Sequence, residues 1–284
     1  MTDATPAGRS TLCPLLIGRG PYIEILRQFC EQARLGQGQT VILAGEPGIG
    51  KSRLAAEAET IAAQAGFTVL HSDCHEDECA VPYAPLLQLL RRHAERVGQP
   101  ALAQDWQVHA PHLVELLPEL RSDWPDAPED ARTGAEQAHA RQYDALASVL
   151  MGAPLPLLLV IEDLHWCDQA SLEFLLRFAR QLVGHPILLL LTYRNDEASP
   201  ELRPLVAELE RTQLAVELNL TRLPRADVAF MIRVIFEQTG PVRPEFSATM
   251  HTLTNGNPLF VEEALKAMVV AGDRKSTRLN SSHG

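Results

Sequence analysis

The sequence has 284 residues, which is enough for one large domain or for a core with a smaller lid. Its formal net charge of −11 argues against binding to DNA or RNA, because an acidic surface repels a phosphate backbone. The longest uncharged stretch, residues 145–161, contains two prolines and is shorter than the ~20 apolar residues of a membrane helix. We therefore expect no membrane span and no nucleic-acid binding by this chain.

The beginning and the cysteines of the chain both bear on its location. The first 13 residues lack the basic patch and the apolar run of a secretory signal. The five cysteines are an odd number and form no regular framework, which is typical of free thiols in a reducing compartment. Both features predict a cytoplasmic protein.

Short apolar runs alternate with longer amphipathic segments from residue 41 to residue 220. The apolar runs predict strands at residues 41–45, 67–71, 157–161, 187–192 and 215–220. The amphipathic segments predict helices at residues 51–65, 86–94, 135–151, 172–182 and 200–211. Strands that alternate with helices indicate an α/β fold with a five-stranded, mainly parallel sheet covered on both faces.

The strand pattern stops after residue 220. Helices are predicted at residues 226–237, 245–253 and 258–270, and the last begins with an asparagine cap followed by proline, Asn257-Pro258. The expected organisation is a flexible tail (1–15), a core (16–221) and a small helical lid (222–272). Residues 98–134 are rich in proline, aspartate and tryptophan and predict an irregular insertion with short helices.

The last residues differ in character from the rest. Residues 273–283 resemble the translation of a sequencing-library adapter and have no apolar periodicity. A disordered basic tail is the alternative interpretation. We predict that residues 273–284 are not native and that the natural chain continues beyond Gly272, so these residues are left out of the reasoning about the fold.

A glycine-rich loop follows the first predicted strand and precedes the first predicted helix of the core. Its sequence matches the P-loop pattern G-x-x-x-x-G-K-[ST], in which backbone N–H groups and a helix N-terminus surround a phosphate. Lys51 is expected to contact the β- and γ-phosphates, and Ser52 is expected to bind Mg²⁺. The expected ATP-binding residues are Gly45, Glu46, Pro47, Gly48, Ile49, Gly50, Lys51, Ser52 and Arg53. The motif in this context predicts the P-loop NTPase fold rather than an ordinary glycine turn.

Two further features follow predicted strands of the core. Glu162 and Asp163 come directly after a buried strand, as in a Walker B motif, where one carboxylate binds Mg²⁺ and the other orients the attacking water. We assign Glu162 to Mg²⁺ and Asp163 to the water, and the reverse assignment stays open. Arg194 follows the next strand, so its guanidinium is expected near the γ-phosphate or a carboxylate of the lid.

Several segments together resemble the STAND class of AAA-type P-loop ATPases, and most closely the ATPase module of large ATP-binding LuxR-family regulators. They are Leu16-Ile-Gly-Arg19, Val81-Pro-Tyr-Ala-Pro85, Val160-Ile-Glu-Asp-Leu-His-Trp-Cys-Asp168, Thr192-Tyr-Arg194 and Asn255-Gly-Asn-Pro-Leu-Phe260. The likeness covers residues 15–272. It implies that Arg19 lies near the base and ribose and that Pro258 packs near adenine.

The resemblance implies a switch, in which bound ATP and its hydrolysis favour different positions of the lid. It further implies slow ATP hydrolysis, possible self-association of the full-length protein and a C-terminal DNA-binding output domain beyond this fragment. An oligomeric AAA-type machine or loader is the alternative, and would need an arginine supplied in trans, with Arg141, Arg177 and Arg180 as candidates. A small-molecule kinase is a third interpretation, which the helical ending disfavours.

Overall fold

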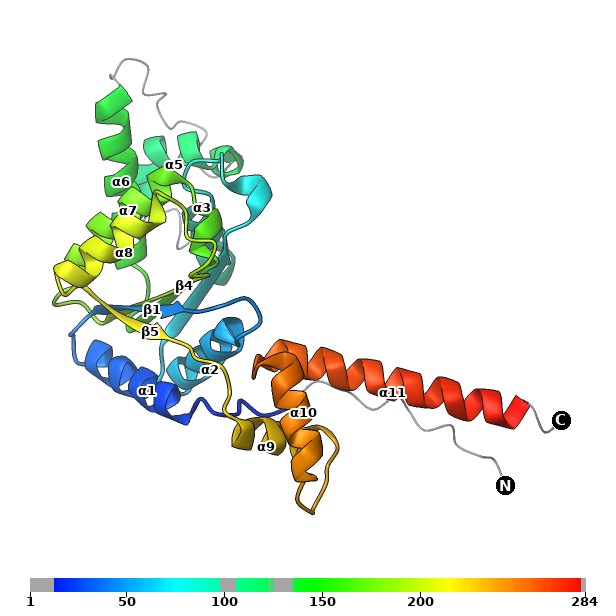
Figure 1. Ribbon diagram of the computed structural model, residues 1–284. Helices are drawn as coiled ribbons and strands as arrows, with labels where there is room; N and C mark the ends of the chain where they lie inside the picture. The colour runs from blue at the N-terminus through cyan, green and yellow to red at the C-terminus, as the bar shows by residue number, and fades with distance from the viewer. Residues whose placement is uncertain (1–12, 98–105, 123, 125–134, 282–284) are drawn as a thin grey trace. The chain divides into compact units, whose positions relative to one another are not determined.

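The computed structural model describes residues 13–97, 106–122, 124 and 135–281 (Figure 1). The chain forms two compact units. One, here called the P-loop unit, comprises Met1–Glu24, Gly45–Leu54 and Asn219–Gly284, and the other, the sheet unit, comprises Ile25–Ala44 and Ala55–Leu218. The predicted tail, residues 1–15, lies mostly outside the described residues, and the predicted boundary between core and lid stays a prediction.

The sheet unit is built on one five-stranded sheet with the order β2-β3-β4-β1-β5. The strands are β1 (Gln39–Ala44), β2 (Thr68–Asp73), β3 (Leu157–Glu162), β4 (Ile187–Tyr193) and β5 (Ala215–Asn219). The pairs β2–β3, β3–β4 and β4–β1 are parallel. Every residue of β3 and β4 is buried, as expected for parallel strands covered on both faces. The predicted α/β fold is therefore confirmed.

Helices cover both faces of the sheet. Those of the sheet unit are α3 (Ala84–Val97), α5 (Ala110–Leu116), α6 (Ala135–Met151), α7 (Gln169–Gln181) and α8 (Leu202–Arg211). The helices α1 (Gly20–Arg34) and α2 (Lys51–Gln64) begin in the P-loop unit and continue into the sheet unit. Figure 1 shows α1 and α2 on one face of the sheet and α6, α7 and α8 on the other, which gives three layers.

The predicted strands and helices are confirmed to within a few residues, except that the last helix extends to Ser281 and not to residue 270, and that one helix was omitted. Helix α1 was not predicted, although its buried residues Leu26, Cys30 and Ala33 are spaced as on one helix face. In the described part of the insertion, the predicted short helices are α5 and the 3₁₀ turns η2 (Gln107–His109) and η3 (Pro118–Ser122). The other 3₁₀ turns are η1 (Glu76–Glu78) and η4 (Leu164–Trp166).

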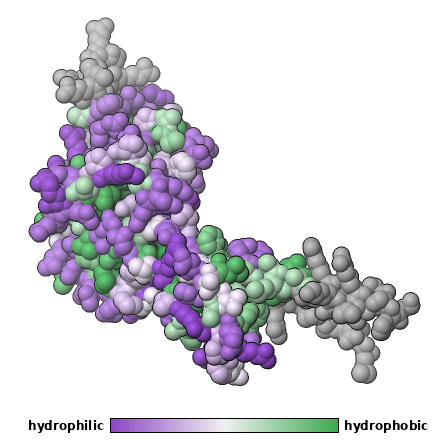
Figure 2. Space-filling view, in the orientation of Figure 1, coloured by the Kyte–Doolittle hydropathy of each residue, from purple (hydrophilic) through white to green (hydrophobic). Residues whose placement is uncertain are grey.

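The P-loop unit contains three helices after β5: α9 (Arg225–Ile235), α10 (Pro244–Thr254) and α11 (Pro258–Ser281). Apolar residues such as Val228, Met231, Met250 and Val261 form their common core. Leu259, Phe260, Met268 and Val270 of α11 are exposed, and Figure 2 shows apolar residues along this helix. Helix α11 continues into the residues that resemble an adapter. Among the helices that the structure describes, none combines the length and apolar character needed to cross a bilayer.

Candidate nucleotide-binding site

The glycine-rich loop lies where the sequence places it, between the end of β1 at Ala44 and the start of α2 at Lys51. Gly48 has a φ of +73°, and a Cβ at this position would lie 2.7 Å from Leu259 Cβ. A larger residue would therefore be strained and would collide with the start of α11. The loop conformation thus depends on glycine for two separate reasons.

The side chain of Lys51 points toward the P-loop that precedes it. Its Nζ donates hydrogen bonds to the carbonyl oxygens of Gly45 at 2.8 Å and Glu46 at 3.0 Å, and the residue is only 7% exposed. Its charge is thus held inside the curve of the loop, where a phosphate group would be bound. This position fits the role expected from the sequence.

The Asn255–Phe260 segment contacts the loop through a residue that the sequence analysis used only as a helix cap. Asn257 is buried, and its Nδ2 donates to the carbonyl of Pro47 at 2.9 Å. Its Oδ1 accepts from the N–H of Leu259 at 3.1 Å, which confirms the predicted cap of α11. The neighbouring Pro258 is partly exposed. Asn257, rather than Pro258, therefore joins this segment to the P-loop.

Arg19 is also held at the loop. Its guanidinium is 3% exposed and donates to the carbonyl of Ile49 at 2.9 Å. Burial lowers the pKa of Arg19 from its ordinary value, whereas Tyr22 and Asp227 raise it. Because the ordinary pKa of arginine exceeds 12, the group stays charged. The structure therefore brings a buried positive charge, predicted from the Gly-Arg segment, next to the P-loop.

Two other arginines make contacts that the sequence analysis did not predict. Arg53 donates to the carbonyls of Cys13 at 2.7 Å and Leu15 at 3.1 Å and pairs with Glu262 at 3.4 Å, so its side chain contacts residues 13 and 15 instead of pointing to a phosphate site. Arg222, which the sequence analysis missed, makes two hydrogen bonds to Glu46 of the P-loop at 2.7 and 2.9 Å. Ser52 is exposed at the start of α2.

In the sheet unit, Glu162 ends β3 as a buried carboxylate. The hydroxyl group of Thr192 contacts both Glu162 and Asp163. Thr192 Oγ1 accepts a hydrogen bond from the N–H of Asp163 at 3.0 Å and lies 3.5 Å from Glu162 Oε2. His71 Nε2 lies 3.8 Å from Glu162 Oε1. The hydrogen bond between the imidazole of His71 and the carboxylate of Glu59, which accepts it, is the main cause that raises the pKa of His71 to about 9, and Asp73 adds to it. His71 is therefore a cation at neutral pH.

A cluster of polar side chains lies next to Glu162 in the sequence and at the end of β4. It consists of Asp163, His165, Arg194 and Glu197. Arg194 Nε lies 3.8 Å from Asp163 Oδ1, and Arg194 Nη1 pairs with both oxygens of Glu197 at 3.0 and 3.1 Å. The imidazole of His165, 1% exposed, lies 3.7 Å from Asp163 and 3.4 Å from Glu197. The structure thus brings Asp163 and Arg194 together, and adds Glu197, three residues after Arg194, which the sequence analysis missed.

The carboxyl ends of the parallel strands meet at one edge of the sheet. Glu162 ends β3, Tyr193 ends the adjacent β4, and Ala44, which pairs with Tyr193, ends β1 directly before the P-loop. Ligands of such sheets bind beyond this edge. The carboxylates of Glu162 and Asp73 there offer the oxygen ligands that Mg²⁺ prefers, whereas protonated His71 does not.

Comparison with known proteins agrees with this geometry. Residues 15–191 match the family model of the AAA ATPase domain. An uncharacterized protein of Rhizobium meliloti (strain 1021) is 26% identical over 289 residues, and the alignment covers 94% of this chain and 26% of the relative. The chain therefore spans about a quarter of the length of that relative.

Two solved structures show the same fold at low sequence identity. The Aeropyrum pernix ORC1 protein, solved in complex with DNA, has a TM-score of 0.55 at 17% identity, covering 94% of this chain and 64% of that chain. The ORC2 protein of the same organism, solved as ADPNP-ADP complexes, has a TM-score of 0.55 at 16% identity, covering 93% and 66%. Because the family match includes the P-loop and β3 and spans more than half of the sequence, the chain belongs to the AAA ATPase domain family.

Proposed function

We propose that this chain is the ATP-binding, slowly hydrolysing switch module of a signal-transducing regulator, in which Lys51 and the P-loop bind the phosphates of ATP. The observation that carries the proposal is the position of Lys51, buried inside a loop between a strand and a helix. Its ammonium donates to two loop carbonyls, which a phosphate would replace as partners.

The residues at the ends of β3 and β4 are proposed to complete the site. Mg²⁺, held by Glu162 and Ser52, would neutralise the charge of the phosphates. Asp163 orients the attacking water, and Arg194 interacts with the γ-phosphate. In the structure Arg194 pairs with Glu197, so this ion pair must open before the guanidinium reaches a phosphate. That requirement fits slow hydrolysis.

The contacts of the helical segment support a switch rather than a simple binding protein. Asn257 donates to the loop carbonyl of Pro47, and the N–H of Leu259 donates to that of Gly48 at 3.3 Å. A nucleotide that rearranges the loop would change these contacts, and hence favour one position of the lid by its differential affinity. The signal-transducing role itself rests on the resemblance to LuxR-family regulators.

Substitution of Lys51 tests the binding site. With Mg-ATP at a hundred times its dissociation constant, the wild-type protein gains about 2.7 kcal/mol of stability, which raises its melting temperature. We expect Lys51→Ala to lose this shift, because the variant lacks the charge that faces the phosphates. Lys266→Ala, which removes an exposed lysine of α11, is the control. Normal ATP-induced stabilisation of Lys51→Ala would refute the site.

The rate of ATP hydrolysis distinguishes the switch from the alternative, an oligomeric AAA-type machine or loader. We expect intrinsic hydrolysis near about 10⁻⁴–10⁻² per second, as in switch NTPases to which no arginine finger is supplied in trans. Steady-state phosphate release, measured over a range of protein concentrations, gives the rate. A rate of several turnovers per second that rises with protein concentration and disappears in Asp163→Asn would favour the machine. A slow rate independent of concentration would support the switch.

A further inference from the structure

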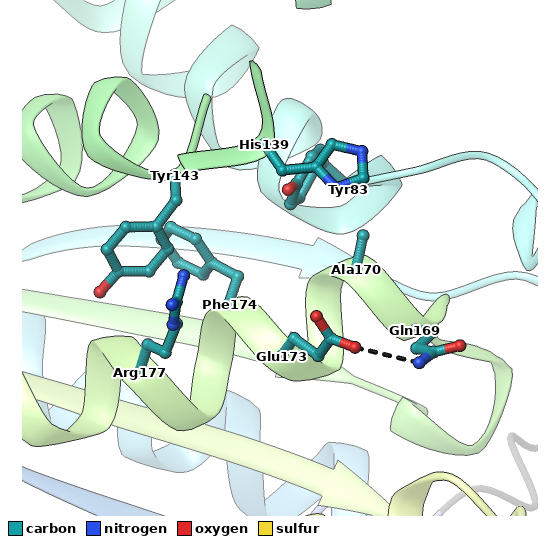
Figure 3. Close-up of a pocket in the computed structure, with 8 residues that line it drawn as sticks. All are labelled: Tyr83, His139, Tyr143, Gln169, Ala170, Glu173, Phe174 and Arg177. Carbon is teal, nitrogen blue, oxygen red and sulfur yellow. Dashed lines mark hydrogen bonds between the residues drawn. The ribbon is translucent and has the colours of Figure 1, made fainter. Parts of the chain in front are cut away.

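A cavity of about 370 Å³ lies in the sheet unit, and neither Glu162 nor Asp163 is among the residues that line it. It is partly open to solvent and is lined by residues of α6 and α7 and by Tyr83, which directly precedes α3 (Figure 3). Its volume is within the range of small-molecule sites. Tyr83 belongs to the Val81–Pro85 segment, which is typical of the resembled class and has no part in the proposed ATP chemistry.

The inner wall of the cavity is aromatic. Tyr83, Tyr143 and Phe174 are 6%, 8% and 1% exposed, so their rings are almost fully enclosed. The rings of Tyr143 and Phe174 are 5.1 Å apart between centroids, and Figure 3 shows both beside the cavity. Such a wall favours a flat apolar group, which packs against ring faces and edges.

The rim of the cavity carries separated charges of opposite sign. Glu173 and Arg177 are four residues apart on α7, a spacing at which such residues commonly pair. In the described part of the chain they do not pair: Glu173 accepts from Gln169 Nε2 at 3.0 Å, and the Arg177 guanidinium lies 5.3 Å from the centroid of the Tyr143 ring. Figure 3 shows the two side chains turned in these different directions. The cavity therefore offers one negative and one positive group.

Both charges act on the hydroxyl group of Tyr83. Burial raises the pKa of Tyr83, Asp168 and Glu173 raise it further, and Arg177 lowers it. The backbone of Tyr83 is also unusual, with a φ of +63°, which is rare for a bulky residue. The N–H of Tyr83 donates to Asp168 at 3.1 Å, and the same carboxylate caps α7 through Ser171. Tyr83 is thus held in a strained conformation between the start of α3 and the N-terminus of α7.

We propose that this cavity binds a small aromatic zwitterion, such as a free aromatic α-amino acid. The ligand carboxylate pairs with Arg177, the ammonium pairs with Glu173, and the ring packs among Tyr83, Tyr143 and Phe174. A ligand with one charge leaves the second rim group without a partner. A phosphate ester is disfavoured, because the rim has a single arginine and a carboxylate that repels phosphate.

Isothermal titration of the full chain, in the absence of ATP, tests the proposal independently of the ATPase function. The probes are L-phenylalanine, L-tyrosine and L-tryptophan, together with 3-phenylpropionate and phenethylamine, which each lack one of the charges. We expect at least one amino acid to saturate a single site. Each singly charged analogue should bind about tenfold more weakly or worse, because it loses a charge-assisted contact.

Variants locate the site. Arg177→Gln and Glu173→Gln should each weaken binding of the amino acid by about tenfold or more. Ala170→Leu, which keeps both charges but adds bulk at the cavity wall, should also abolish binding. Arg180→Gln is the matched control, because Arg180 is an exposed arginine of α7 that pairs with Glu208 instead. A thermal melt of each variant excludes unfolding.

Three outcomes would overturn the proposal. They are the absence of saturable binding by all three amino acids, equal binding of the singly charged analogues, and unchanged affinity in the folded Arg177→Gln variant. Binding that is lost in Arg177→Gln and Ala170→Leu but kept in Arg180→Gln would support it.

Discussion

Arg194 illustrates how single residues set the state of the proposed active site. Its guanidinium lies between the carboxylates of Asp163 and Glu197, and the shorter distances, 3.0 and 3.1 Å, are those to Glu197. Glu197 therefore neutralises the charge that is proposed to reach the γ-phosphate. His165 is buried beside both carboxylates. This ion pair restrains Arg194.

Substitution of Glu197 should release this restraint. We expect Glu197→Gln to bind ATP about two- to fivefold more tightly, since a partly exposed ion pair that competes for Arg194 is worth up to about 1 kcal/mol. ADP affinity should stay unchanged, because ADP has no γ-phosphate. Titration calorimetry of both nucleotides gives the comparison. The control is Glu201→Gln, which removes an equal charge from an exposed position before α8.

The opposite result for Glu197 would be informative. If Glu197→Gln weakened ATP binding, Glu197 would position Arg194 for the phosphate instead of holding it back. If ATP and ADP affinities changed equally, Arg194 would not discriminate the γ-phosphate, and its proposed role would be wrong.

The residues of the candidate site differ in how far the sequence could predict them. Lys51 and Glu162 belong to contiguous motifs with a recognisable strand before them. Glu197 follows Arg194 by three residues, a spacing at which opposite charges can pair, so this contact had a local signal that was overlooked. The pair between Arg222 and Glu46 joins residues 176 positions apart, for which a single sequence carries no local signal.

At the scale of elements, prediction succeeded where burial leaves a clear pattern of apolar residues in the sequence. Strands β3 and β4 are buried along their whole length, so their sequences are uninterrupted apolar runs. Helix α1 was overlooked because it begins with Gly20 and Pro21, which are poor helix formers, although Leu26, Cys30 and Ala33 have the spacing of one helix face. Asn257 was recognised as a helix cap, but its contact with Pro47 depends on tertiary packing.

Helix α2 and strand β2 are joined by an ion pair whose strength depends on pH. Glu59 of α2 bonds to His71 of β2 and is the largest cause that raises the pKa of His71 to about 9. The ordinary pKa of histidine is about 6.5. Because the folded-state value is the higher one, the stabilisation is fully present below about pH 6.5 and is lost as the pH rises through about 9.

Replacement of Glu59 should reveal this link between the two elements. In Glu59→Gln we expect the pKa of His71 to fall, as followed by NMR titration of the imidazole without Mg²⁺. Below pH 6.5 the free energy of unfolding of the variant should be lower than that of the wild type. This difference in free energy should shrink toward pH 9. Glu57→Gln, on the same helix, should leave the His71 titration unchanged. A difference in stability independent of pH would contradict the assignment.

At the scale of the whole molecule, charge limits which partners the chain can bind. The formal net charge is −11, and the basic residues of the resembled motifs are engaged locally: Arg19 and Lys51 donate to carbonyls of the P-loop, and Arg194 pairs with Glu197. Release of counterions from DNA by lysine and arginine drives binding to its backbone. Here the overall charge opposes that binding.

We therefore predict that this chain does not bind DNA specifically, even if the full-length protein does. The sequence before Gly272 predicts no helix-turn-helix with a basic recognition helix. Arg274, Lys275 and Arg278, in the segment that resembles an adapter, would add weak attraction at low salt. The measurement is a gel-shift titration of residues 1–272 and of the full chain at physiological salt, with the expected affinity no tighter than about 10⁻⁶ M for either. Sequence-specific retention of residues 1–272 would show that the ATPase module itself contains a DNA-reading element, because that fragment lacks the basic tail.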